Sequence, residues 1–220
     1  MADEKVHRGY GKLYAKFIHR FSRLSYYLFA SGENFSDLVL NMIDFKKSER
    51  ILDIGCGVGS LLFDIHKSLK FKNKDSKRLM IGMDRSKEMI KIALKRVREN
   101  EKEVLFLICD ASDMPFKSNA FDICFNVLLL HHLPPQSKIR VMNETCRILS
   151  NKGACVIMDL DNPSSIIGWF IALSRWYVST IRTNFQYGLK HFFTEAGMRV
   201  EAHIKKLGIF SYYRVRKINI

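Results

Sequence analysis

Short apolar runs alternate along the middle of the chain with longer segments in which apolar residues recur at helical spacing. Short continuous apolar runs are typical of buried strands, and the helical spacing is typical of amphipathic helices. Strand and helix therefore alternate from Arg50 to Leu160, which predicts an α/β fold with parallel strands joined by crossover helices. The predicted strands are 51–54, 78–84, 104–111, 121–127 and 154–159, and the predicted helices have their inward residues within 61–69, 86–97 and 139–149. Asn151-Lys152-Gly153 is expected to close the last of these helices.

The two ends of the chain continue this pattern differently. Aromatic residues are frequent before residue 30, and apolar residues at helical spacing follow from Phe35 to Ile43. After the fifth strand comes an apolar helical segment, and the tail predicts a helix to Ala196, a stop at Gly197 and two strands, 198–204 and 207–218. We therefore expect one domain over 1–220. Its parts are an N-terminal helical cap (1–48), a core (49–160), a helical insertion (161–190) and a C-terminal helix and hairpin (191–220).

The first predicted strand ends at a turn that contains three glycines. The sequence Asp53-Ile54-Gly55-Cys56-Gly57-Val58-Gly59 leads directly into the first helix. Glycine adopts backbone angles that side chains forbid and lets a ligand lie against the main chain. A dinucleotide-binding turn would place its third glycine at position 60, which is Ser here. Asp53 suits a cationic or hydroxyl-bearing ligand better than a phosphate.

Acidic residues also end the second and third strands. Asp84 precedes Ser86, a candidate N-cap for the next helix, and Asp110 follows the third strand. Because the carboxyl ends of parallel strands are where open α/β sheets bind ligands, these carboxylates are candidate ligand-binding groups. The alternatives are that Asp84 caps its helix and that Asp110 is a turn residue.

These motifs together resemble those of class I S-adenosylmethionine-dependent methyltransferases, specifically the type 11 and ubiquinone/menaquinone-biosynthesis groups. Besides the glycine turn, the resemblance rests on residues 110–116, 119–122 and 147–153. The sequence departs from the family pattern at Ala154, where the family has a glycine. The resemblance covers roughly the central half of the chain. It implies a Rossmann-like three-layer sandwich with a seven-stranded, mostly parallel sheet whose last strand is antiparallel. It also implies N-terminal helices that close the site and an insertion after strand five.

The resemblance further implies specific contacts with S-adenosylmethionine. Asp84 would accept hydrogen bonds from both ribose hydroxyls, and Asp110 would accept one from the adenine amino group, with the Ala111 amide nearby. The cofactor-binding residues expected in this way are Asp53, Gly55, Cys56, Gly57, Gly59, Asp84, Arg85, Met89, Asp110, Ala111 and Asn126.

Composition limits the remaining chemistry. The net charge is +14, and 47% of the residues are hydrophobic, which is enough for a full core. The first residues carry acids and no apolar core, so no signal peptide is expected, and a cytoplasmic location follows. The five cysteines lack metal-ligand spacing, so we expect no metal site.

His131 and His132, just after the fourth strand, are the candidate catalytic residues, because His exchanges protons near neutral pH. The alternative is that they shape the site without transferring protons. Direct displacement on a small, apolar or lipid-like acceptor is the expected reaction.

Two other functions remain open. The basic charge would suit a nucleic-acid methyltransferase, but the motifs of amino-methylating and cytosine-carbon enzymes are missing. A non-catalytic cofactor-binding or partner-binding protein is the other alternative.

The segment from Asn162 to Tyr187 contains both tryptophans of the chain and has too few consecutive apolar residues to span a membrane. Three interpretations of its apolar residues stay open. It is a lid over an apolar acceptor pocket, a peripheral membrane contact through 164–182, or a homodimer surface.

Overall fold

The structure is a computed structural model that describes residues 35–45, 49–72, 78–100 and 104–218. A seven-stranded sheet in the order β3-β2-β1-β4-β5-β7-β6 forms its centre. The strands are β1 (Arg50–Ile54), β2 (Leu79–Asp84), β3 (Val104–Ile108), β4 (Phe121–Val127), β5 (Leu149–Leu160), β6 (Met198–Lys206) and β7 (Phe210–Lys217). β1 to β5 pair in parallel, whereas β7 runs antiparallel to both β5 and β6. The predicted sheet with an antiparallel last strand is therefore confirmed.

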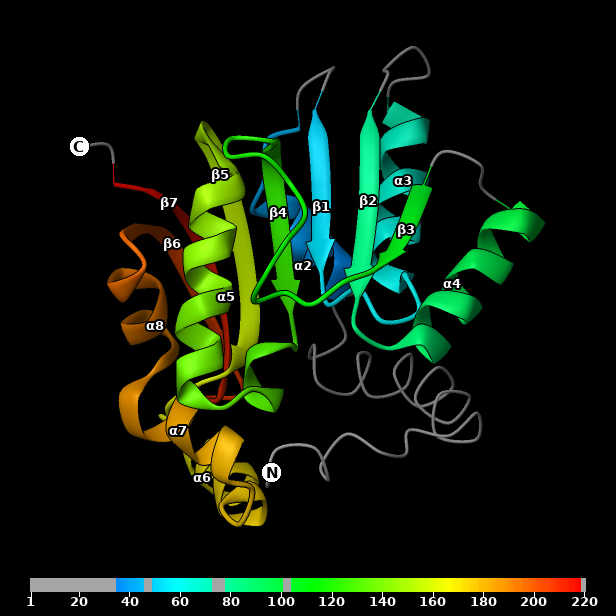
Figure 1. The fold of residues 1–220 in the computed structure, drawn as a ribbon. Helices are drawn as coiled ribbons and strands as arrows, with labels where there is room; N and C mark the ends of the chain where they lie inside the picture. The colour runs from blue at the N-terminus through cyan, green and yellow to red at the C-terminus, as the bar shows by residue number, and fades with distance from the viewer. Residues whose placement is uncertain (1–34, 46–48, 73–77, 101–103, 219–220) are drawn as a thin grey trace, which may run out of the picture.

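Helices cover both faces of the sheet and complete a three-layer sandwich (Figure 1). The described helices are α2 (Phe35–Asn41), α3 (Ser60–Lys72), α4 (Lys87–Asn100), the short 3₁₀ helix η1 (Leu130–His132), α5 (Pro135–Ile148), α6 (Ile166–Arg175), α7 (Ser179–Tyr187) and α8 (Leu189–Glu195). The N-terminal part of the predicted helical cap, with its aromatic residues before residue 35, lies outside the described residues.

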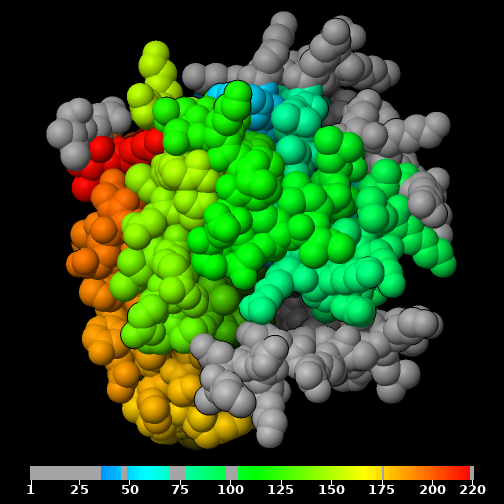
Figure 2. Space-filling model, in the orientation of Figure 1, coloured from blue at the N-terminus to red at the C-terminus, as the bar shows by residue number. Residues whose placement is uncertain are grey.

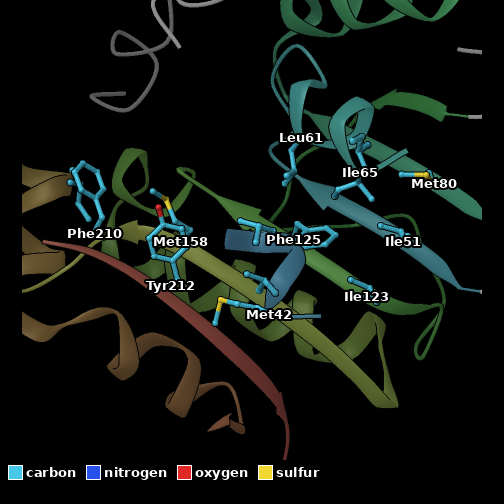
Figure 3. Close-up of a cluster of buried hydrophobic side chains, with 14 of the residues drawn as sticks. Met42, Ile51, Leu61, Ile65, Met80, Ile123, Phe125, Met158, Phe210 and Tyr212 are labelled. Atoms are coloured by element: carbon cyan, nitrogen blue, oxygen red, sulfur yellow. The ribbon is translucent and has the colours of Figure 1, made fainter. Parts of the chain in front are cut away.

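The core is divided in two by the sheet, because successive side chains of a strand point to opposite faces. Ile51 belongs to the cluster on the α2 and α3 side, shown in Figure 3, whereas Leu52 belongs to the cluster on the α5 and α8 side. Phe125 and Cys124 of β4 divide in the same way, and all four side chains are fully buried. Strands buried on both faces read as continuous apolar runs, which is why they were recognisable in the sequence.

The strand order reverses its direction between β1 and β4. From β1 the chain moves outward to β2 and β3, then crosses back to β4 on the other side of β1. Crossovers that leave in opposite directions open a space at the carboxyl ends of the two central strands, where such sheets bind ligands. The arrowheads of these strands point to the end of the molecule where α6 and α7 lie (Figure 1).

The boundary between α5 and β5 differs from the prediction. The helix ends at Ile148, Leu149 has extended backbone angles and pairs with Phe121, and β5 begins there. Asn151-Lys152-Gly153 therefore lies inside the strand and does not close the helix. Leu149 is fully buried in the core on the α5 side, so its apolar character reflects that core and not a further helical turn.

The last two strands also differ slightly from the prediction, because the turn between them is tight. Leu207 and Gly208 both have positive φ values, of 51° and 68°, and β7 begins at Phe210 instead of Leu207.

The insertion after β5 contains two helices, α6 and α7. In the part of the chain that the structure describes, no helix has the length and apolar character needed to cross a membrane.

Candidate active site

The glycine turn joins β1 to α3 and lies against the end of β2. The amides of Gly55 and Cys56 donate to the Met83 carbonyl at 2.8 and 2.9 Å. Gly55, Gly57 and Gly59 have φ values of 77°, 55° and 76°, a region that side chains rarely adopt. The turn therefore requires glycine at all three positions.

The three glycines differ in what lies beside them. A Cβ on Gly59 would lie 2.5 Å from the Phe106 ring, and one on Gly55 would lie 3.0 Å from Leu129, whereas one on Gly57 would meet nothing within 4 Å. Gly59 is thus required for packing, whereas Gly57 faces open space in which a ligand can approach the main chain. Cys56 is buried, and burial raises the pKa of its thiol, so it stays a neutral thiol.

Asp84, at the end of β2, accepts two backbone hydrogen bonds. Oδ2 accepts from the Gly57 amide at 2.9 Å, and Oδ1 accepts from the Ser86 amide at 2.8 Å. Burial raises the pKa of this carboxyl, and the two amides partly oppose that effect. Asp84 therefore connects the glycine turn to the start of α4, where the Ser86 hydroxyl accepts from the Met89 amide as an N-cap. Each carboxylate oxygen can accept more than one hydrogen bond, so ribose hydroxyls can share these atoms.

Asp53 is 2% exposed, although the turn beside it opens to ligand. Burial, with a smaller contribution from the Asp84 carboxylate, raises the pKa of Asp53 to about 8. Without a cation nearby, Asp53 is thus mostly protonated at neutral pH. A positively charged ligand group in contact with it would favour the ionised form.

Asp110 follows β3 in a loop fixed to the end of β2, because the Cys109 amide donates to the Asp84 carbonyl at 3.1 Å. Its Oδ1 accepts from the Ser112 hydroxyl at 2.6 Å and from the Ser112 amide at 2.9 Å, and these bonds lower the pKa of the carboxyl. The predicted turn role is therefore present, and the exposed side chain is also placed at the carboxyl edge of the sheet. Ala111 follows it, half-buried.

Asn126 is fully buried near the end of β4, beside Ile54 of β1. Neither its amide nitrogen nor its amide oxygen has a hydrogen-bond partner among the described residues. Burying an amide without partners costs free energy, so such a group indicates a missing polar ligand. Asn126 lies near the carboxyl ends of β1 and β4, and its orphaned amide fits a polar ligand bound there.

The β4 exit, residues 127–133, carries the candidate acid–base group. Leu128 adopts a φ of 53°, a strained conformation of a kind that is concentrated at functional sites. In η1, His131 Nδ1 lies 2.7 Å from Asp159 Oδ1, and the His131 amide donates to Asp159 Oδ2 at 3.1 Å. His132 is exposed and its ring lies against that of His131, with centroids 3.9 Å apart. The two predicted histidines therefore differ in exposure, and His131 is held by the buried Asp159 carboxylate.

Asp159 was not predicted as a functional residue. It ends the fifth predicted strand, and this position was the one signal in the sequence that could have indicated it. Asp159 is fully buried, and burial alone would raise its pKa, but His131 and the backbone amides of Leu160 and His131 lower it overall. Asp159 is therefore an ionised carboxylate that orients the His131 ring.

Lys138 is a second buried group that the sequence analysis missed. Its Nζ donates to the Thr180 carbonyl at 2.7 Å, to the Thr183 hydroxyl at 2.6 Å and to the Asn184 side-chain oxygen. Asn184 in turn donates to the Leu160 carbonyl at 2.9 Å. Lys138 thus joins α5 to α7 and to the end of β5, and so fixes α7 next to η1.

Known proteins resemble this chain over the region that carries these features. The profile of the methyltransferase domain family matches residues 45–203. A tRNA (carboxymethyluridine(34)-5-O)-methyltransferase from Xenopus tropicalis is 32% identical over 53% of this chain and 16% of its own length. A demethylmenaquinone methyltransferase from Thermotoga maritima is 30% identical over 58% of this chain and 50% of its own length. The chain therefore spans half or less of these two relatives.

The fold is also found in solved structures. A SAM-dependent methyltransferase from Aquifex aeolicus superposes with a TM-score of 0.65 at 20% identity, over 94% of this chain and 99% of the other. The fold is that of a Rossmann-like α/β protein, and its candidate site residues lie at the carboxyl edge of the sheet. This chain belongs to the methyltransferase domain family, and the prediction that it is of the S-adenosylmethionine-dependent class is confirmed.

Proposed function

We propose that the chain transfers a methyl group from S-adenosylmethionine to a small apolar acceptor. The observation that carries this proposal is the β4 exit, where His131, held by Asp159, is flanked by partly buried leucines. Leu129 packs at the glycine turn, within 3.0 Å of the place a Gly55 Cβ would take. An acceptor that enters beside the cofactor turn would therefore meet apolar side chains and one oriented imidazole. Apolar sites with few polar groups are usual for small molecules.

The cofactor would be held by the residues at the carboxyl edge of the sheet. Asp84 would accept the ribose hydroxyls, and Asp110 with the Ala111 amide would bind the adenine. Arg85 and Met89 would flank the nucleoside, and Asn126 would gain the hydrogen-bond partners it lacks. The main chain of Gly55, Cys56 and Gly57 would lie against the ligand at the open side of the turn, near Asp53. S-adenosylmethionine, when bound, supplies a methyl group on a sulfonium that needs no further activation.

His131 would act as the general base for an acceptor that must lose a proton. Asp159 accepts from Nδ1, which selects the tautomer in which Nε2 carries the lone pair. Nε2 would take the proton from the acceptor hydroxyl, thiol or amine as the acceptor bonds to the methyl carbon. The carbon–sulfur bond of the sulfonium would break in the same step, and S-adenosylhomocysteine would leave. The buried Asp159 carboxylate would stabilise the resulting imidazolium, as in other His–carboxylate pairs.

The experiment uses methyl-labelled S-adenosylmethionine with two acceptor preparations, a mixture of demethylated quinones chemically reduced to their quinols, and bulk tRNA. Label is expected in the organic phase and not in the RNA. Label in the tRNA would instead favour the nucleic-acid alternative, which the basic charge and the tRNA-modifying relative support. Tight S-adenosylhomocysteine binding without transfer to either preparation would favour a non-catalytic protein and contradict the proposal.

Asp159→Asn tests the role of His131 as the base. It preserves the shape of the side chain but removes the charge that orients and stabilises His131, so transfer should slow by about 10²–10⁴-fold. The dissociation constant for S-adenosylhomocysteine should not change. An unchanged rate would show that His131 only shapes the site.

A further inference from the structure

Helix α6 turns its small residues inward and its large apolar residues outward. A Cβ on Gly168 would lie 2.6 Å from the Gly208 carbonyl oxygen, so this position packs directly on the turn between β6 and β7. Ala172, one turn later, is fully buried. On the outer side, Ile166 is 79% exposed and Phe170 is 71% exposed. An amphipathic surface helix of a soluble protein has the opposite arrangement, with its large apolar side chains facing the core.

These outward residues form one surface, which we call the α6 patch. Each of its members is at least half exposed, and most are three or four positions apart, on one side of the helix and its C-terminal extension. The members are Ile166, Ile167, Trp169, Phe170, Leu173 and Tyr177. Figure 2 shows that the α6 segment, in yellow, forms one end of the molecule. A contiguous exposed surface of aromatic and branched side chains requires a partner that covers it.

The positive charge of the residues near the α6 patch indicates which kind of partner would bind it. From Asn162 to Thr194 the chain contains no Asp or Glu, and its basic residues include Arg182 and Lys190. Lys205 adds positive charge on β6, where its Nζ donates to the Asn162 carbonyl at 2.8 Å. An apolar face that contains Trp and Phe, bordered by Lys and Arg, is typical of helices that lie in the interface of an anionic bilayer. A second copy of this chain would bring the same positive charge, and the two would repel.

We propose that the α6 patch docks the protein on anionic phospholipid membranes. The strand carboxyl ends and the α6–α7 insertion lie at the same end of the molecule (Figure 1), so docking would bring the candidate active site to the bilayer surface. α7 contacts η1, which links the docked insertion to the segment that carries His131. This inference concerns where the protein works and goes beyond the proposed function, since it does not depend on which acceptor is methylated.

Flotation of the full chain with vesicles tests the proposal. The probes are phosphatidylcholine vesicles with and without phosphatidylglycerol. The chain should bind only the anionic vesicles, more weakly as salt increases, and its tryptophan emission should shift to the blue on binding. The double variant Ile166→Ser/Phe170→Ser should bind at least about tenfold more weakly, because it removes two apolar side chains from the interface. Lys190→Glu, an exposed charge reversal, should also weaken binding.

The control is Leu105→Ser/Ile108→Ser on β3, at the opposite edge of the sheet. These side chains are 53% and 54% exposed, so the loss of surface apolar area is similar, and vesicle binding should not change. Retained S-adenosylhomocysteine binding shows that each variant is folded, and loss of methyl transfer would not alter the vesicle result. The proposal is overturned if the chain does not float with anionic vesicles at low salt, or if the α6 double variant floats like the unmodified chain. A dimer in buffer that this variant converts to a monomer, without vesicle binding, would identify a second copy as the occupant.

Discussion

Asp84 has the helix-start role that its sequence context suggested, together with a contact that was not predicted. It accepts the Ser86 amide at the start of α4, as a helix-capping residue would, and it also accepts the Gly57 amide of the glycine turn. These two bonds hold the open face of Gly57 beside the carboxylate. The same side chain therefore arranges the turn, and in the proposed cofactor site its oxygens would also accept from the ribose hydroxyls.

Replacement of Asp84 by Ala should weaken S-adenosylhomocysteine binding by about 1.5–3 kcal/mol, because two ribose hydrogen bonds to a charged acceptor are lost. This corresponds to a roughly tenfold to 150-fold increase in the dissociation constant, measurable by calorimetry. Asp113→Ala, which alters an exposed carboxylate beyond Asp110, should bind like the unmodified chain. NAD should not bind to any of these proteins. If Asp84→Ala leaves the dissociation constant unchanged, the carboxylate serves only the turn and the helix.

Among the elements, α7 depends on polar contacts for its position. Lys138 reaches from α5 to three acceptors on α7, and Asn184 continues the connection to the end of β5. Burial lowers the pKa of Lys138 to about 8, while Asp159 partly opposes this effect. The ammonium also lies 5.1 Å from the centroid of the Phe192 ring on α8. One side chain therefore joins helices that a purely apolar contact would orient less specifically.

Lys138→Met should lower the free energy of unfolding by about 2–4 kcal/mol, because it leaves the α7 acceptors buried without a donor. Urea unfolding measures this loss. Tryptophan emission of the folded variant should also change, since Trp176 stacks on Phe185 of α7 with centroids 6.4 Å apart. Lys152→Met, at an exposed lysine in β5, should change neither quantity. Equal stabilities of the two variants would contradict the role of Lys138.

The molecule as a whole carries a net charge of +14, yet Asp53, near the end of β1, is a buried acid that is hard to ionise. The pKa of Asp53 is about 8 in the folded chain, whereas an unfolded Asp has a pKa of ~3.9. Between these values the folded state binds more protons than the unfolded state. Stability must therefore fall as the pH rises through this range.

Raising the pH from about 6 to about 8 should lower the free energy of unfolding of the unmodified chain more than that of Asp53→Asn. The difference between the two decreases should be about 2–3 kcal/mol. Asparagine has no proton to lose, so the variant should lack this part of the pH dependence. Urea titrations of the ligand-free protein at several pH values measure the difference. Asp113→Asn, an exposed position, should follow the unmodified chain. Parallel pH profiles for Asp53→Asn and the unmodified chain would show that Asp53 is ionised in the fold.

The sheet, its crossover helices and the acids at its strand ends were predictable because each depends on residues close together in the sequence. Buried strands read as apolar runs, and the glycine turn follows directly from β1. The start of β5 was not predictable, because Leu149 extends the helical spacing of α5 and only its pairing with Phe121 makes it a strand residue. The cap before residue 35 stays a prediction, as does each contact with cofactor.

The sequence by itself thus determined the fold class and the positions of Asp53, Asp84 and Asp110, because strand ends are marked locally. Only the tertiary structure decided which polar groups meet. His131 and Asp159 are 28 positions apart, and Lys138 and Asn184 are 46 apart, so no local pattern connects them. The outward direction of the α6 patch was decided in the same way. A helix buries the side that its neighbour can approach closely. The backbone at Gly208 lies so near α6 that only small side chains fit between them, so the small residues of α6 face inward.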